Sequence, residues 1–148
     1  MEVYRASAWR QISSAEAFVG GAWRTLSYGE SYIGGAWRRV ATFVQPLTLS
    51  LSPTFVLGRG LGGGTGGRYI STIAISALPG GGLGPYTYVW TIAPGSGGAA
   101  AGSPSSASSS LGALLFPGDS IASYATCTAT DSLGSTAAAV GNFELYYS

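Results

Sequence analysis

The chain has 148 residues, of which 46% are hydrophobic and only 9% are charged, with seven arginines, six acidic residues, no lysine and no histidine. Soluble domains usually carry about 25% charged residues, so this composition predicts that part of the surface is covered by other copies or other proteins, unless the abundant Gly, Ser and Ala keep it soluble without charge. The composition excludes the clustered basic patch that nucleic-acid binding requires, and no apolar run of about 18 residues is present to span a membrane.

A repeat occupies the start of the chain. The first 42 residues divide into three units of 14, each with Glu at its second position, an aromatic residue at its fourth and Ala-Trp-Arg at its eighth to tenth. The units read MEVYRASAWRQISS, AEAFVGGAWRTLSY and GESYIGGAWRRVAT. A period of this kind predicts one small structural unit per repeat.

The chemistry of each unit predicts a β-hairpin. In the second unit Gly20-Gly21 can adopt the positive φ of a two-residue turn between two extended runs. The same kind of turn is expected about Gly34-Gly35 in the third unit and, without glycines, about Ala6-Ser7 in the first unit. The expected cross-strand pairs are Tyr4 with Trp9, Phe18 with Trp23, Tyr32 with Trp37, Val19 with Ala22, and Glu16 with Thr25.

The hairpins are expected to attach the chain to something else. Isolated two-stranded hairpins are marginal in water, and 42 residues form a thin core, so we expect the tryptophans to pack against other chains. The expected interface residues are Tyr4, Trp9, Arg10, Phe18, Trp23, Arg24, Tyr32, Trp37 and Arg38. The arginines of one unit and the glutamates of the next are further expected to form a ladder. The alternative is that the aromatic pairs are sugar-stacking platforms.

The units Phe18–Arg24 and Tyr32–Arg38, which read FVGGAWR and YIGGAWR, resemble the "YVGGxW(K/R)xV" repeats of small virion proteins in tailed bacteriophages. Those repeats occur in minor tail, tail-fibre and other accessory proteins. The resemblance covers 42 residues, and the first unit departs from it because it lacks both turn glycines.

The rest of the chain has the pattern of a β-sandwich. Pro46 interrupts strand pairing at the join, which predicts a hairpin region at 1–42 and a sandwich at 43–148. Short β-rich runs then alternate with Gly/Pro/Ser loops, and Pro94–Ser108 is an uncharged loop. The expected strands are Leu47–Leu57, Arg68–Leu78, Tyr86–Ile92, Ser109–Leu115, Ile121–Thr130 and Thr136–Tyr147. Gly58, Gly60 and Gly63 form a GxGxxG pattern, but a strand-like run follows, so we interpret them as loop residues.

Two segments, GPYTYVW at 84–90 and YATCTATDSLG at 124–134, resemble immunoglobulin-like and PKD-type domains, which are common appendages of phage virion proteins. The resemblance implies a sandwich core that contains Trp90, Tyr124 and Cys127, with Trp90 packed against the Cys127 position. The second cysteine of that family is missing, so Cys127 is expected to be a buried free thiol.

The chemistry of the side chains argues against catalysis. Without histidine there is no Ser-His or Cys-His pair and no His-based metal site, so we expect no enzyme, no cofactor and no metal. The start of the chain lacks a secretory signal, which predicts assembly in a host cytoplasm. The sequence thus predicts an all-β virion protein of the tail, tail-tip or fibre region, whose partners are other virion proteins or its own copies. The alternatives are a capsid decoration protein and a glycan-binding module for host surfaces.

Overall fold

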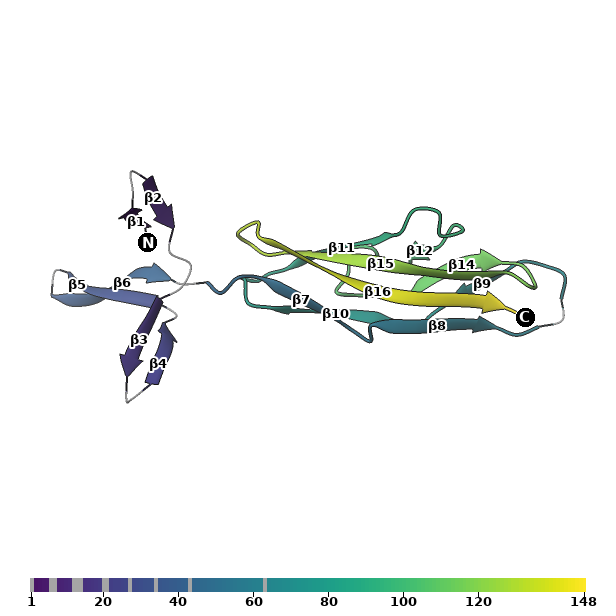
Figure 1. Ribbon diagram of the computed structural model, residues 1–148, viewed down its shortest axis with the longest axis horizontal. Helices are drawn as coiled ribbons and strands as arrows, with labels where there is room; N and C mark the ends of the chain where they lie inside the picture. The colour runs from purple at the N-terminus through teal and green to yellow at the C-terminus, as the bar shows by residue number, and fades with distance from the viewer. Residues whose placement is uncertain are drawn as a thin grey trace. The chain divides into compact units, whose positions relative to one another are not determined.

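Every element of secondary structure in the described part of the chain is a β-strand, so the protein is all-β, as the sequence predicts. The structure is a computed structural model, and it describes residues 2–5, 8–11, 15–19, 22–26, 28–33, 35–42, 44–62 and 64–148. The chain divides into two compact units, Met1–Pro46 and Leu47–Ser148. Figure 1 labels most of the strands of both units.

The described part of the N-terminal unit forms three antiparallel hairpins, and each hairpin is a two-stranded sheet of its own. One hairpin therefore corresponds to each 14-residue repeat. The paired strands are β1 (Glu2–Arg5) with β2 (Ala8–Gln11), β3 (Ala15–Val19) with β4 (Ala22–Leu26), and β5 (Tyr28–Ile33) with β6 (Ala36–Thr42).

The C-terminal unit is an immunoglobulin-like β-sandwich in which a four-stranded sheet and two three-stranded sheets share one hydrophobic core. The four-stranded sheet has the order β11 (Thr87–Ile92), β15 (Ser120–Thr130), β16 (Thr136–Tyr147) and β8 (Phe55–Gly60). Only β16 and β8 among these neighbours run parallel. The three-stranded sheets are β13 (Ser108–Ser109), β10 (Ile75–Gly80) and β7 (Thr48–Ser52), and β12 (Ala100–Ala101), β14 (Leu111–Leu115) and β9 (Arg68–Ser71).

Two runs expected as single strands are each divided in two. The run Leu47–Leu57 is interrupted after Ser52, because Pro53 has no N–H to donate to a ladder. The run Arg68–Leu78 passes from one three-stranded sheet to the other through residues 72–74. At this crossing the Thr72 hydroxyl accepts a hydrogen bond from Leu111 N at 3.0 Å and donates one to the Ile73 carbonyl at 2.7 Å. A side chain thus satisfies the backbone where the ladder changes.

The loop expected at Pro94–Ser108 lies against the free edge of β11 rather than projecting away. Trp90 N donates to the Pro104 carbonyl at 2.8 Å, and Trp90 Nε1 donates to the Ser106 carbonyl at 2.8 Å. Ala77 N donates to the Ala107 carbonyl at 2.7 Å. Because the loop supplies carbonyls to the edge of β11 that does not face β15, it protects an exposed sheet edge.

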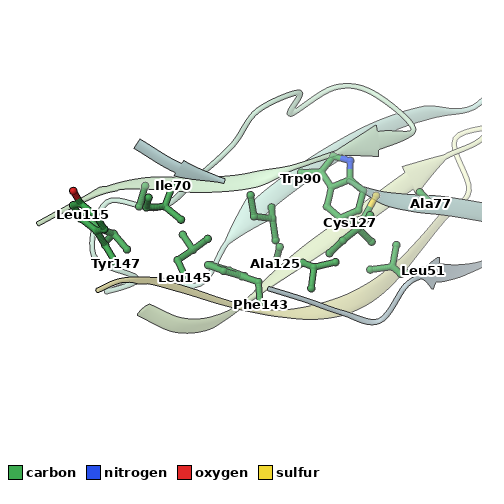
Figure 2. Close-up of a cluster of buried hydrophobic side chains, with 14 residues drawn as sticks. Leu51, Ile70, Ala77, Trp90, Leu115, Ala125, Cys127, Phe143, Leu145 and Tyr147 are labelled. Carbon is green, nitrogen blue, oxygen red and sulfur yellow. The ribbon is translucent and has the colours of Figure 1, made fainter. Parts of the chain in front are cut away.

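Alternation along the strands builds the core. In β15 the residues Ala125, Cys127 and Ala129 are fully buried, while the residues between them are partly exposed. Trp90 lies directly opposite Cys127 and is 4% exposed, so the core contact that the family resemblance implies is confirmed for these two residues. Figure 2 shows the Trp90 ring beside the Cys127 sulfur, with the side chains of β16 further along the sandwich.

The expectation that Tyr124 belongs to this core is wrong. Tyr124 is 46% exposed and faces outward from the four-stranded sheet. The reason is the period of a strand: residues an odd number apart point to opposite faces, and Tyr124 stands three positions before the buried Cys127. Both residues lie on one strand, but they cannot share its inner face.

The interpretation of Gly58 and Gly60 as loop residues is also wrong, while Gly63 lies outside the described residues. Both glycines belong to β8 and are buried on its inner face. A Cβ on Gly60 would lie 2.2 Å from the Ile70 Cδ1 atom, and one on Gly58 would lie 2.9 Å from the Ser71 backbone. These glycines therefore allow β8 to approach β9 closely.

Candidate functional site

The hairpins hold all nine residues expected to form the assembly interface. In each hairpin the backbone places an aromatic residue directly opposite the tryptophan, at the predicted register. The pairs are Tyr4 with Trp9, Phe18 with Trp23, and Tyr32 with Trp37. The side chains of these six residues lie outside the described part of the structure, so the pairing is established for the backbone. A non-covalent aromatic pair at such positions contributes up to about 1 kcal/mol to a hairpin.

The arginine of each unit follows its tryptophan and so belongs to the opposite face of the strand. The residues opposite Arg10, Arg24 and Arg38 are Val3, Ala17 and Ser31. The Arg24 side chain is exposed, whereas the side chains of Arg10 and Arg38 lie outside the described part of the structure. The Arg/Glu ladder between units stays a prediction.

The third hairpin has a glycine with positive φ at its turn and a β-bulge further along its strands. Gly35 has a φ of +82°, so the expected positive-φ glycine is present at this turn. The other expected turn residues, Ala6, Ser7, Gly20, Gly21 and Gly34, lie outside the described residues. Further from the turn, Glu30 pairs with Arg39 but Gly29 pairs with Ala41, which leaves Val40 as the extra residue of a β-bulge. A bulge increases the local twist of a two-stranded ribbon.

No described side chain of residues 1–46 is buried. Every residue of the hydrophobic core identified in the described structure lies between Leu51 and Tyr147. Leu26, Tyr28 and Ile33 are 37%, 43% and 51% exposed, so even large side chains of the hairpin unit remain accessible to solvent. The side chains of the hairpin unit that the structure describes are therefore presented to solvent rather than enclosed.

Cys127 is chemically quiet. Its side chain is fully buried and forms no disulfide. Desolvation by burial raises the pKa of the Cys127 thiol to about 11, because the thiolate is penalised away from water. The thiol thus acts as a small core residue rather than as a nucleophile.

Asp131 lies in the loop between β15 and β16, and its carboxylate accepts hydrogen bonds from this loop and from Leu83. Its Oδ1 accepts hydrogen bonds from Leu133 N at 2.9 Å and Ser135 N at 2.8 Å, and its Oδ2 accepts one from Leu83 N at 3.2 Å. Desolvation opposes ionisation, but the backbone hydrogen bonds from Ser135, Leu83 and Leu133 outweigh it and hold the pKa of Asp131 below its usual range. This carboxylate organises two loops.

Two requirements bear on the described residues, the side-chain cluster of a metal site and the long apolar helix of a membrane span. Within them, no three His, Cys, Asp or Glu side chains gather closely enough to hold a metal ion. Across the same part of the chain there is no helix with the length and apolar character needed to cross a bilayer.

The similarity between this chain and known proteins is low. No protein-family model matches the chain. No curated protein matches it either. Among solved structures, a conjugative transposon lipoprotein from Bacteroides eggerthii is similar over 66% of this chain and 96% of its own, with 14% sequence identity and a TM-score of 0.36.

The structure identifies exposed residues that the sequence interpretation missed. The outer face of the four-stranded sheet carries Phe55, Val89, Tyr124 and Val140, which are 51%, 56%, 46% and 53% exposed. The signal was present in the sequence, because fixing Cys127 as buried assigns every even-numbered residue of β15 to the outer face.

Proposed function

We propose that the chain is a non-enzymatic accessory protein of a tailed-phage virion, in the tail, tail-tip or fibre region. Residues 1–42 attach it to the particle, and the sandwich is displayed by that attachment. The observation that carries the proposal is that three repeated hairpins, each with an aromatic residue opposite a tryptophan, contain no buried side chain among those described.

The energetics of small sheets support an external partner. A lone two-stranded hairpin buries too little apolar surface to offset the cost of ordering its backbone, which is about 1–2 kcal/mol per residue. Burying one aromatic side chain against a partner contributes about 3 kcal/mol. Three equivalent hairpins thus gain most when they pack on other virion proteins or on copies of the same chain. The likeness of the repeats to phage virion repeats gives the kind of particle.

The charges support a role without catalysis. Asp131 is engaged by three backbone N–H groups, and Asp119 Oδ2 accepts a hydrogen bond from Phe116 N at 2.9 Å in a turn. Both carboxylates are therefore committed to loop structure. General acid–base chemistry needs a titratable group aimed at a substrate, and neither group is available for that work.

The test is incorporation into particles. Tagged wild-type chain, a deletion of residues 1–42 and the double variant Trp23→Ala/Trp37→Ala are expressed during infection by the phage that carries the gene, and virions are purified by density gradient. We expect wild-type chain in the virion band, and loss of the deletion and of the double variant from it. The control Val89→Ala/Leu133→Ala removes exposed apolar side chains from the sandwich and is expected to incorporate normally.

Normal incorporation of the chain without residues 1–42 contradicts the proposal. So does equal loss of the sandwich control, because attachment then does not depend on the hairpins. Circular dichroism of each purified variant verifies that the sandwich remains folded.

A further inference from the structure

The outer face of the four-stranded sheet carries a polar residue with one aromatic residue on each side of it. Asn142 of β16 pairs with Tyr124 of β15 on one side and with Phe55 of β8 on the other. The three residues therefore form one row across three strands. Tyr124 and Phe55 are 46% and 51% exposed, so both rings are accessible from solvent. The next row contains Glu144, flanked by Ala122 and Leu57.

A hollow of about 350 Å³ lies over this row. Its lining comprises Phe55, Ala122, Ser123, Tyr124, Asn142, Phe143 and Glu144. We call this hollow the Phe55–Tyr124 groove. Its volume is within the range of small-molecule sites, which begins at about 300 Å³. Ala122 contributes a small side chain to this lining, and Phe55 and Tyr124 lie on the two sides of Asn142.

A second hollow, of about 490 Å³, adjoins the groove on the other side of β15. It is lined by residues 93–97 and 120–124, and it shares Ala122, Ser123 and Tyr124 with the first. The loop that forms its wall is fixed, because Ala93 N donates to the Tyr124 carbonyl at 3.1 Å and Ser96 Oγ donates to the Ala93 carbonyl at 2.6 Å. The two hollows therefore meet along residues 122–124.

Phe55 and Tyr124 stand far enough apart to admit a saturated ring between them. Phe55 and Tyr124 are separated by two strand intervals, which amounts to about 10 Å across the sheet. A ring in van der Waals contact with an aromatic face on each side needs about 7–8 Å between those faces. Between these two residues, the Asn142 amide offers a donor and an acceptor, and the Glu144 carboxylate offers acceptors, to hydroxyl groups. Neither side chain has a hydrogen-bond partner among the described residues.

The topology disfavours a peptide as the occupant. A peptide that extends a sheet needs an unpaired strand edge. The groove lies over residues 122–124 of β15 and 142–144 of β16. There β16 is paired with both β15 and β8. The pairing of β15 with β11 ends at Ala125, and the edge of β15 beyond it is flanked by the loop at 93–97, whose Ala93 N donates to the Tyr124 carbonyl. Charge disfavours an anionic ligand, because the one charged residue in the lining is Glu144. The nearby Arg59 lies over the Tyr146 ring, with 4.9 Å from its Cζ to the ring centroid.

We propose that the Phe55–Tyr124 groove is a binding site for a neutral oligosaccharide. One sugar ring lies between the two aromatic side chains, with its hydroxyl groups on Asn142 and Glu144, and the chain of sugars continues past Tyr124 into the adjoining hollow. This site belongs to the sandwich and does not depend on how the hairpins attach.

The test uses the full-length chain labelled with ¹⁵N. Maltotriose, chitotriose and mannotriose are titrated separately to about 10 mM, a concentration high enough to detect dissociation constants in the millimolar range. We expect at least one of them to shift the amide signals of Phe55, Tyr124 and Asn142 in a saturable way. Tyr124→Ala and Phe55→Ala should each weaken that binding at least about tenfold, and Tyr124→Phe should retain it.

The matched control is Val89→Ala, which removes an exposed apolar side chain from the same sheet face but lines neither hollow. We expect it to bind as the wild type does, and unchanged core amide signals verify that each variant is folded. No saturable shift with any of the three sugars overturns the proposal. A shift confined to residues 1–42, or binding unaffected by both alanine variants, overturns it as well. None of these outcomes bears on incorporation into particles, which is measured separately.

Discussion

Replacing Gly58 with alanine should destabilise the sandwich strongly, although alanine is usually the better residue in a strand. A Cβ on Gly58 would lie 2.5 Å from the Leu145 Cδ2 atom and 2.9 Å from the backbone carbon and oxygen of Ser71. Carbon atoms in ordinary contact are about 3.5–4.0 Å apart, so the methyl group is about 1 Å too close to both neighbours. Leu145 is fully buried and Ser71 contributes backbone of β9, so neither can move aside without disturbing the core.

The magnitude follows from these contacts. An extra methyl group in a packed core costs typically about 1–3 kcal/mol, and the clash with backbone places this variant at the upper end, at about 3 kcal/mol. For a domain of roughly 60–100 residues, each kcal/mol lowers the melting temperature by about 4–8 °C. We therefore expect Gly58→Ala to melt about 12–24 °C below the wild type.

The assay is thermal unfolding followed by circular dichroism, with Gly66→Ala as the matched control. A Cβ on Gly66 would have no atom within 4 Å, and this residue is exposed. Its replacement should leave the melting temperature unchanged or raise it slightly, because alanine restricts the unfolded chain. If Gly58→Ala melts within 2 °C or so of Gly66→Ala, the close approach of β8 and β9 described above is refuted.

Three further predictions concern the sandwich. Cys127 should react with a thiol reagent only on unfolding, since it is buried and its pKa is raised to about 11; rapid modification of the native protein contradicts its place in the core. The pKa of Asp131 is lowered in the folded state, so its contribution to stability is present above its unfolded pKa of about 3.9 and is lost as pH falls through the lower folded pKa. The gap in melting temperature between wild type and Asp131→Asn should therefore be open at pH 6 or so and narrow in acid, and a gap independent of pH counts against this role. Trp90→Phe removes the Nε1 hydrogen bond to the Ser106 carbonyl and should cost about 2 kcal/mol in chemical denaturation. The Ala77 amide, which donates to the Ala107 carbonyl of the same loop, should exchange faster; exchange as slow as in the wild type shows that the loop is held by other contacts.

Local chemistry predicts the hairpins well. A repeated aromatic residue, a two-residue turn and a tryptophan fix the register by simple counting, and Tyr4, Phe18 and Tyr32 all pair as expected. The bulge at Val40 could not be predicted in this way, because one extra residue on a strand changes the pairing without changing the pattern around the turn.

Long-range packing sets the limit for the sandwich. The buried positions of Trp90 and Cys127 follow from pattern and resemblance, whereas the inward position of Gly58 depends on how closely β9 passes it, which no local signal reports. The exposure of Tyr124 follows from the strand period once Cys127 is assigned to the core. The groove beside Tyr124 depends in addition on the parallel pairing of β8 with β16, which aligns Phe55 with Asn142.

Amide hydrogen exchange of the chain, free and on the particle, tests most directly whether the hairpins are the attachment site. Lone hairpins open readily, so the amides of residues 1–42 should exchange fast in the free chain, while those of the sandwich strands are protected. On the purified virion the hairpin amides should become protected, and the sandwich strands should change little. Hairpin amides that are already protected in the free monomer, or that stay unprotected on the particle, contradict the account.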